Sequence, residues 1–239
     1  IMGKRCIDEV LEVAPERIVQ AYTTKEESDH LGELEWRGIP IKRVARESLD
    51  RLVSSPYHQS LVLEVKEVDQ HEMRTYVEGL ELLDTSLILM LDSITDPNNL
   101  GAILRAAECF GVDCVIWSKN RGVDITPAVS KVSVGASELV TVIRVSNLVE
   151  AAKQLKEVGY TLVASAIDKS AVSTNSYIFP RKAVLMMGSE EKGLHALLAA
   201  QADETVYVPM KGRIDSLNVS QATAALLLTA ARSHDEIAL

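Results

Sequence analysis

The sequence predicts an α/β protein with a small N-terminal α/β domain followed by a larger domain built on a parallel β-sheet. From residue 86 onward, near-continuous apolar segments alternate with segments of helical apolar spacing. This alternation is typical of parallel strands that helices cover on both faces. The change of pattern places the first domain at 1–68, a charged and less apolar connection at 69–85, and the second domain at 86–239.

The first domain is expected to contain two helices and three strands. Residues 4–13 have helical apolar spacing, and a second helix is expected near 47–54. Three β-branched segments are typical of strands, and they lie at 17–23, 39–45 and 60–68.

The second domain is expected to alternate strand and helix. Six apolar segments predict strands at 86–94, 114–118, 139–145, 161–167, 182–188 and 204–210. Helices are expected around 98–110, 126–136, 147–158, 194–201 and 218–233. In open parallel sheets, ligands bind beyond the carboxyl ends of the strands. Polar segments that contain glycine follow three of these strands, so the functional site is expected there.

Composition excludes several classes of protein. Hydrophobic residues make up 47% and charged residues 25% of the chain, as in an ordinary globular protein, and no apolar run reaches transmembrane length. The N-terminus lacks the basic and then apolar layout of a signal peptide. The three cysteines form no C-x-x-C pair and the five histidines have no metal-ligand spacing. The resulting prediction is a cytoplasmic protein with reduced thiols and no metal.

The net charge of −9 argues against a protein that coats nucleic acid through a general positive charge. Contact with RNA would therefore depend on a local patch. The best candidate, the basic patch, consists of Lys42, Arg43, Arg46 and Arg51. A solvated helix face beside a strand end explains the same four residues at least as well.

The first candidate segment, 92–105, begins at the end of a predicted strand. It contains an aspartate followed by a proline, which is typical of a helix start. Asn99 then lies at the mouth of the helix, and Arg105 lies about two turns further on. The helix around Arg105 is otherwise apolar, so its guanidinium needs an anionic partner. From spacing alone, an ion pair with Asp92 or Glu108 is the favoured explanation.

The second candidate segment, 188–193, has the sequence Gly-Ser-Glu-Glu-Lys-Gly and directly follows an apolar strand. Two glycines around a short acidic loop suit close approach of the backbone to a ligand. A plain strand-to-helix turn would explain them equally well. The position of the lysine before the second glycine excludes a P-loop.

The third candidate segment, 208–220, leads from a tight turn into a helix rich in Ala and Leu. Ser216, Asn218 and Ser220 lie at the expected N-terminus of that helix, where side-chain oxygens cap free amides and the local potential favours anions. Capping explains one of these residues easily and all three less well.

Together and in this order, the segments resemble the three motifs of the SpoU-type family of 2′-O-ribose RNA methyltransferases, within the trefoil-knotted methyltransferase superfamily. The matching patterns are D-P-x-N-x-G-x-x-x-R at 96–105, G-x-E-x-x-G at 188–193 and P-M-x-G-x-x-x-S-L-N-V-S at 209–220. The combination is highly specific. The N-terminal part resembles the ribosomal-protein-like RNA-binding domain of many members, although Ser60 stands where that domain usually has glycine.

The resemblance implies a knotted (trefoil) second domain that uses S-adenosylmethionine as methyl donor and no metal. Backbone in the knot would bind the donor, around Met187, Gly188, Val208, Met210 and Leu217. Arg105 would position and electrostatically activate the ribose 2′-hydroxyl, because a guanidinium is an awkward general base. Base action by Arg105 stays open if a phosphate relays the proton. The residues that would orient the arginine, the nucleotide and the motif loops are Asn99, Glu190, Ser216 and Asn218.

The resemblance also implies a homodimer that acts on structured ribosomal RNA, with a guanosine of the 23S rRNA as the expected target. Three rival functions stay open: a tRNA ribose methyltransferase, a non-catalytic RNA-binding or ribosome-assembly protein, and a small-molecule methyltransferase. The N-terminal domain favours rRNA over tRNA, and a small-molecule enzyme would gain nothing from residues 1–68. Retention of all the motif residues argues against the non-catalytic protein. No strand is followed by G-x-G-x-x-G, which disfavours a dehydrogenase.

Overall fold

The computed structural model describes residues 1–66, 72–80, 82–166, 171–214 and 216–238. The chain forms two compact units. The first comprises Ile1–Asp69 and Asp124–Leu139, and the second comprises Gln70–Val123 and Val140–Leu239. Four parts of the expectations lie outside the described residues: the end of the strand 60–68, part of the connection 69–85, the last residue of the strand 161–167, and position 215 of the third segment.

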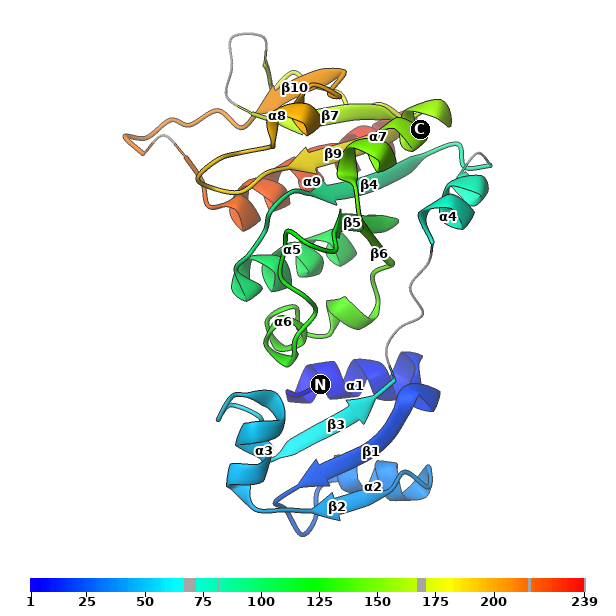
Figure 1. The fold of residues 1–239 in the computed structure, drawn as a ribbon, viewed down its shortest axis with the longest axis vertical. Coiled ribbons are helices and arrows are strands. Elements are labelled where there is room, and N and C mark those ends of the chain that lie inside the picture. The colour runs from blue at the N-terminus through cyan, green and yellow to red at the C-terminus, as the bar shows by residue number, and fades with distance from the viewer. Residues whose placement is uncertain (67–71, 81, 167–170, 215, 239) are drawn as a thin grey trace. The chain divides into compact units, whose positions relative to one another are not determined.

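The first unit contains a three-stranded sheet with packed helices (Figure 1). The strand order is β2-β1-β3, with β2 parallel and β3 antiparallel to β1. Ile7, Val10, Leu34 and Leu63 pack together in its apolar core. Its N-terminal elements are α1 (Lys4–Val13), η1 (Pro15–Arg17), β1 (Ile18–Thr23), α2 (Asp29–Trp36), β2 (Ile41–Arg43), α3 (Arg46–Val53) and β3 (Leu61–Val65). The two expected helices and three expected strands are confirmed.

The helix α2 was not predicted from the sequence. Only Leu31 and Leu34 of this segment are buried, and Trp36 is 82% exposed. Its apolar spacing is therefore too sparse to indicate a helix. The signal that could have located it is Ser28, whose hydroxyl accepts a hydrogen bond from the Leu31 amide at 3.4 Å as an N-cap.

The first unit also includes the helix expected at 126–136, which is shorter than predicted. It is divided into α6 (Pro127–Val132) and a 3-10 turn, η2 (Ala136–Glu138). Gly135 has a φ of +95° between them, a conformation that ends an α-helix. Because η2 extends to Glu138, the strand expected at 139–145 begins three residues later than predicted, at Val142.

An ion pair links this segment to the N-terminal residues of the same unit. Glu138, whose side chain is 5% exposed, accepts a hydrogen bond from Arg17 Nη2 at 3.0 Å. The hydroxyls of Ser130 and Ser137 also donate to its carboxylate, at 3.2 and 3.1 Å. The carboxylate is thus buried with several donors, as a buried charge requires.

Ser60 has a backbone conformation that favours glycine, with a φ of +66°. Its amide donates to His58 Nδ1 at 3.0 Å, and its hydroxyl makes no hydrogen bond to a residue that the structure describes. The left-handed conformation costs a residue with a Cβ about 1–2 kcal/mol, and glycine loses about 0.5–1 kcal/mol in chain entropy. We expect Ser60→Gly to raise the free energy of unfolding by about 0.5–1 kcal/mol, measured by urea denaturation.

Ser60→Ala is the matched control for this prediction. It removes the hydroxyl but keeps the Cβ, so its stability is expected to stay close to that of the wild type. A Ser60→Gly protein that is less stable than Ser60→Ala would contradict the strain argument.

The second unit is built on a seven-stranded parallel sheet with the order β6-β5-β4-β9-β7-β10-β8 (Figure 1). All six predicted strands are confirmed, although several end earlier than predicted. The additional strand, β8, has two residues and is too short to give a pattern. The bounds are β4 (Ser86–Leu91), β5 (Cys114–Ser118), β6 (Val142–Val145), β7 (Thr161–Ser165), β8 (Val172–Ser173), β9 (Lys182–Met187) and β10 (Glu204–Tyr207). The threading that a knot requires stays a prediction.

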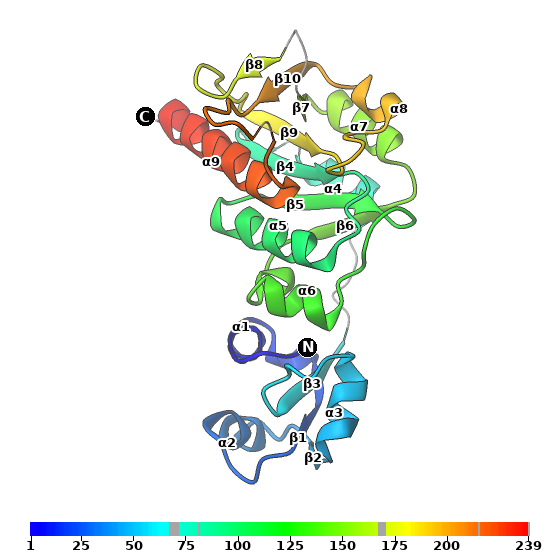
Figure 2. The ribbon, with the colours of Figure 1, turned by 90° about the vertical axis from the view of Figure 1, so that its left-hand side faces the viewer.

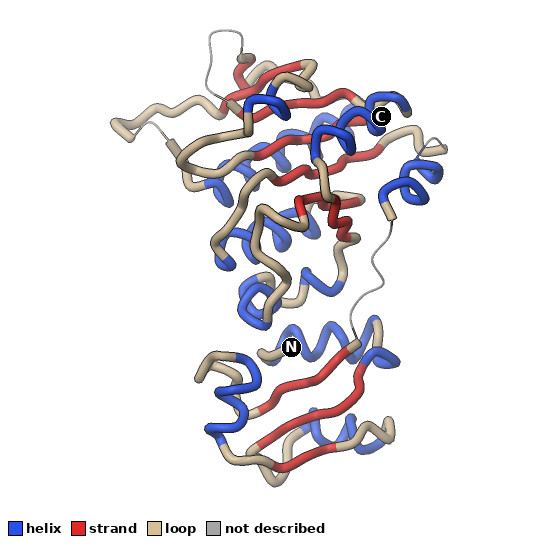
Figure 3. The backbone as a smooth tube through the Cα atoms, in the orientation of Figure 1, coloured by secondary structure: helices blue, strands red, loops and turns tan. Residues whose placement is uncertain are grey.

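Helices cover both faces of this sheet, and Figure 3 shows strand and helix alternating along the chain. On one face, α5 (Pro97–Cys109) and α9 (Val219–Ala238) lie side by side (Figure 2). The other face is covered by α4 (Met73–Leu80), α7 (Leu148–Glu157) and α8 (Ala196–Ala199). All six residues of β4 are buried, as expected of a strand covered on both faces.

The helix α4 lies within the segment expected as a connection. Leu80 is its only buried residue among those that the structure describes, and it joins the core formed with Leu155 and Leu198. A helix that buries so little gives a weak apolar pattern, which explains why the sequence did not predict it.

None of the helices in the described ranges is long and apolar enough to cross a membrane. The described residues also contain no group of three or more His, Cys, Asp or Glu side chains that could hold a metal ion.

The three cysteines differ in exposure, because Cys6 and Cys114 are buried and Cys109 is exposed. Burial raises the pKa of the Cys6 and Cys114 thiols to about 12, so both stay protonated near pH 8 and react slowly. We expect one fast equivalent of the thiol reagent DTNB in the folded protein and three after unfolding in guanidinium chloride. The fast reaction should disappear in Cys109→Ser, and its persistence there would show that a buried thiol is accessible.

Candidate active site

The fold brings the three candidate segments together. β4 and β9 are hydrogen-bonded parallel neighbours, so the segments 92–105 and 188–193 leave the same edge of the sheet. The segment 208–220 runs from β10 to the start of α9, which lies beside α5 (Figure 2). At the start of α5, Asp96 Oδ1 accepts a hydrogen bond from the Asn98 amide at 2.9 Å. This confirms the helix start that the aspartate and proline predict.

Asn99, Glu190 and Asn218, one from each segment, form a hydrogen-bonded network. Asn99 Nδ2 donates to Glu190 Oε1 at 3.3 Å, and Asn218 Nδ2 donates to Asn99 Oδ1 at 2.9 Å. Glu190 Oε1 also accepts from the Val219 amide at 3.2 Å. The network holds the motif loops against one another, which is compatible with the orienting role that the resemblance implies.

Asn218 also caps the start of α9, because its Oδ1 accepts from the Ser220 amide at 2.8 Å and from the Ser220 hydroxyl at 2.6 Å. Capping and the network therefore use different atoms of the same side chain. Ser216 is exposed and makes no hydrogen bond to a described residue. The structure does not bring it into the network, and its role stays a prediction.

Arg105 lies exposed on α5 and makes no hydrogen bond or ion pair with any residue in the described ranges. The ion pair with Asp92 or Glu108 that spacing favours is wrong. The side chain of Asp92 is 3% exposed and accepts instead from His195. The guanidinium of Arg105 is therefore available to an anion from outside the chain, such as an RNA phosphate.

The loop Gly188–Gly193 closes on itself. Ser189 and Gly193 form an antiparallel bridge, and the Gly193 amide donates to the Ser189 carbonyl at 2.8 Å. A Cβ at Gly188 would overlap the main chain of Gly193 and Leu194. The first glycine is therefore required by the loop itself, whereas the sequence suggested close approach to a ligand.

The residues expected around the methyl donor include a stretch of uncovered main chain. Between Pro209 and Ile214, no main-chain amide or carbonyl bonds to a described residue. Val208 and Met210 are half-buried, Leu217 is 37% exposed, and Met187 is buried. Free backbone donors and acceptors beside uncovered apolar side chains suit a ligand with an adenine ring, a ribose and an aliphatic amino-acid chain. These residues therefore fit S-adenosylmethionine.

The basic patch is exposed on the first unit. Arg43 and Arg46 donate to the carbonyls of residues 26 and 56, at 3.2 and 3.4 Å, and Arg51 donates to a serine hydroxyl at 3.3 Å. Within the described residues, none of the four cations of the basic patch forms an ion pair with a carboxylate. Their charge is available to phosphate, and contact with RNA stays a prediction.

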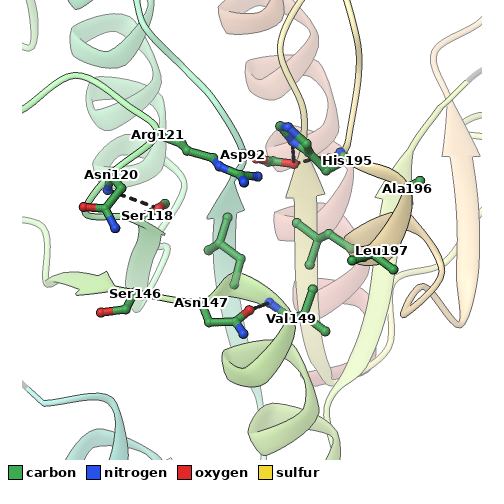
Figure 4. Close-up of a pocket in the computed structure, with 12 residues that line it drawn as sticks. Asp92, Ser118, Asn120, Arg121, Ser146, Asn147, Val149, His195, Ala196 and Leu197 are labelled. Atoms are coloured by element: carbon green, nitrogen blue, oxygen red, sulfur yellow. Dashed lines mark hydrogen bonds and ion pairs between the residues drawn. The ribbon is translucent and has the colours of Figure 1, made fainter.

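Two adjoining cavities contain residues that the sequence did not indicate. The first, the motif cavity, has a volume of about 420 Å³ and is lined by Asn99 and Glu190, among others. The second, the side cavity, has a volume of about 680 Å³ and lies beyond β4, β5 and β6 (Figure 4). Arg121 and His195 line both cavities. The sequence signal that could have indicated Arg121 and His195 is their position in the segments that follow β5 and β9.

His195 is held by a buried carboxylate. Asp92 Oδ2 accepts from the His195 amide and from His195 Nδ1, each at 2.8 Å (Figure 4). No spacing rule connects two residues that lie 103 positions apart in the sequence, and only the neighbouring strands β4 and β9 bring them together.

Comparison with known proteins assigns the chain to a class of RNA-modifying enzymes. Residues 86–228 match the SpoU rRNA Methylase family, and residues 1–71 match a domain described as RNA 2′-O ribose methyltransferase substrate binding. The chain belongs to the SpoU rRNA methylase family, which confirms the resemblance seen in the sequence.

Curated relatives match along nearly their whole length. The 23S rRNA (guanosine-2′-O-)-methyltransferase RlmB of Escherichia coli is 35% identical over 239 residues, which covers 98% of this chain and 98% of the relative. The RlmB of Acinetobacter baylyi is 34% identical over 238 residues, 97% of this chain and 96% of the relative.

Solved structures share the fold. The SpoU methyltransferase AviRb from Streptomyces viridochromogenes, in complex with the cofactor AdoMet, has a TM-score of 0.79 at 23% identity and covers 100% of this chain and 90% of its own. A TrmH/SpoU tRNA modifying enzyme of A. aeolicus has a TM-score of 0.57 at 26% identity and covers 70% of this chain and 86% of its own. The predicted fold class is thereby confirmed.

Proposed function

We propose that this protein transfers a methyl group from S-adenosylmethionine to the ribose 2′-hydroxyl of a guanosine in 23S ribosomal RNA. The observation that supports this most is the network of Asn99, Glu190 and Asn218, which joins all three motifs at the start of α5. The same helix carries the exposed guanidinium of Arg105. The substrate follows from the curated relatives, whose names specify 23S rRNA and guanosine.

The chemistry that these residues have to perform is activation of a weak nucleophile, since a ribose hydroxyl is hardly ionised near neutral pH. Arg105 binds the phosphate beside the target ribose and holds the 2′-oxygen in line with the methyl carbon. Its charge stabilises the negative charge that develops on that oxygen. The bond from oxygen to carbon forms while the carbon–sulfur bond breaks with its electrons on sulfur, and the hydroxyl proton passes to the phosphate or to water. When bound, the donor supplies the electrophilic methyl group.

The basic patch and a second copy of the chain complete the proposal. Lys42, Arg43, Arg46 and Arg51 contact the RNA backbone, and the protein works as a homodimer in the cytoplasm. Support for a dimer comes from Leu228 of α9, a large apolar side chain that is 38% exposed. Light scattering after size exclusion should give twice the chain mass, and a fully active monomer would refute the dimer.

The reaction is tested with labelled S-adenosylmethionine and two substrates from cells that lack the protein, deproteinised 23S rRNA and bulk tRNA. Label in a single 2′-O-methylguanosine of the rRNA is the expected result. Label in tRNA alone would keep the chemistry and overturn the target. No label in rRNA, tRNA or intact large subunits would overturn the proposed enzyme and favour a binding protein.

A further inference from the structure

The side cavity extends the site beyond the residues of the three motifs. It shares Arg121 and His195 with the motif cavity, which contains Asn99 and Glu190. A strand of RNA whose target ribose lies at the motif residues therefore has a second recess directly beside it. We propose that the side cavity is a base-binding subsite for the nucleotide that adjoins the methylated one. This proposal depends on the proposed function for the identity of the RNA.

The walls of the side cavity suit a nucleobase. Leu148, Val149 and Leu197 line it, and Leu197 is 76% exposed although it is a large apolar side chain. An apolar wall that is open to solvent gives a flat base a surface to pack against. Proteins that read single-stranded RNA hold unstacked bases against flat side-chain surfaces, most often aromatic rings or arginine, and here His195 and Arg121 line the same cavity as the aliphatic wall.

The rim of the side cavity offers hydrogen-bonding groups for a base edge. Asn147 Oδ1 caps α7 by accepting from the amides of Val149 and Glu150, at 3.0 and 3.4 Å, so its Nδ2 is a free donor that faces no partner among the described residues. Ser146 precedes it in the chain, and Asn120 lines the same cavity beside Ser118 (Figure 4). Carboxamides and hydroxyls can pair with the donors and acceptors of a base edge.

The wall between the two cavities suits a phosphate. Figure 4 shows Arg121 extending toward the Asp92–His195 pair, and its guanidinium makes no hydrogen bond or ion pair with any described residue. The oxygens of Asp92 already accept two hydrogen bonds from His195 and one from the Ser93 hydroxyl. Arg121 is therefore placed to bind the phosphate that joins the target nucleotide to its neighbour.

The first test compares Arg121→Gln with Arg181→Gln. Arg181 is an exposed arginine just before β9, at the edge of the sheet opposite to the cavities, and its replacement removes the same charge. With 23S rRNA as substrate, Arg121→Gln should raise KM about tenfold and leave kcat and the affinity for S-adenosylmethionine nearly unchanged. Its RNA affinity should depend less on salt, with the slope of log K against log salt reduced by about 0.7–0.9. Equal behaviour of the two variants would overturn the phosphate contact.

The second test locates the base directly. Transcripts of 23S rRNA that contain 4-thiouridine or 6-thioguanosine are irradiated with the protein, and the crosslinked peptides are identified by mass spectrometry. Crosslinks to residues 146–149 or 195–198, lost in Leu197→Ser but kept in Leu82→Ser, are expected. Leu82 is an equally apolar control that is 88% exposed.

The two proposals fail in different ways. If wild-type protein methylates the rRNA but crosslinks only outside the side cavity, the subsite is wrong and the proposed function stands. If it crosslinks within the side cavity but transfers no methyl group, the subsite stands as an RNA contact and the proposed function is wrong.

Discussion

Replacing Arg105 by alanine is expected to lower kcat for methyl transfer to 23S rRNA by on the order of 10²–10³-fold, the usual effect of removing one preorganised group that stabilises developing charge. Arg105 is exposed on α5 and has no partner among the described residues, so its loss removes no contact that holds the fold. The thermal midpoint and the affinity for S-adenosylmethionine, measured by calorimetry, should therefore stay close to those of the wild type.

Arg105→Lys separates charge from geometry. A lysine keeps the positive charge but lacks the planar fork that binds a phosphate through two parallel hydrogen bonds, so partial activity is expected. An Arg105→Ala enzyme with near-normal kcat would contradict the assigned role. A loss of kcat together with a loss of donor binding would instead indicate that the arginine supports the donor loops.

The sequence predicted the elements that carry the candidate site because their signals are local. An aspartate and a proline start α5 and fix Asn99 at its mouth, and the apolar run of β9 ends where the glycine loop begins. Each signal depends on neighbours within about a turn of helix or a strand. The strands of the second unit were predicted for the same reason, since a fully buried strand is a continuous apolar run.

What the sequence could not predict depends on strand order. Asn99 and Glu190 are 91 residues apart and Asp92 and His195 are 103 apart, and they meet because β4 and β9 are neighbours in the sheet. Apolar pattern says nothing about which parallel strand lies beside which. The ion pair predicted between Arg105 and Asp92 was wrong for the same reason, because Asp92 is bound to His195, which is distant in sequence. Glu108, only three residues from Arg105, makes no ion pair with it among the described residues either.

The glycines of the loop Gly188–Gly193 are required for a different physical reason than their sequence suggested. The sequence suggested room for a ligand at both glycines. The structure shows that the space at Gly188 is filled by the chain's own main chain at Gly193 and Leu194, whereas a Cβ at Gly193 would meet no atom within 4 Å. The two glycines therefore have different requirements, space at the first and a φ of +64° at the second.

Gly188→Ala is consequently expected to have a much larger effect than Gly193→Ala. The added methyl group cannot be accommodated beside rigid main chain, so the bridge between Ser189 and Gly193 has to open, and Glu190 leaves Asn99. Because this loop is expected to form part of the donor site, affinity for S-adenosylmethionine should fall by about 100-fold or more, equivalent to about 2.7 kcal/mol. Isothermal titration calorimetry measures the loss.

Gly193→Ala provides the matched control, because it adds the same methyl group in open space and introduces only the strain of a left-handed residue, about 1–2 kcal/mol. That strain lowers the thermal midpoint, but the loop can keep its bridge and most of its affinity for the donor. Gly188→Ala binding the donor as well as Gly193→Ala would mean that the loop opens without consequence. The donor would then have to be held by the uncovered main chain between Pro209 and Ile214, and the conformation of the glycine loop would matter only for the network around Asn99.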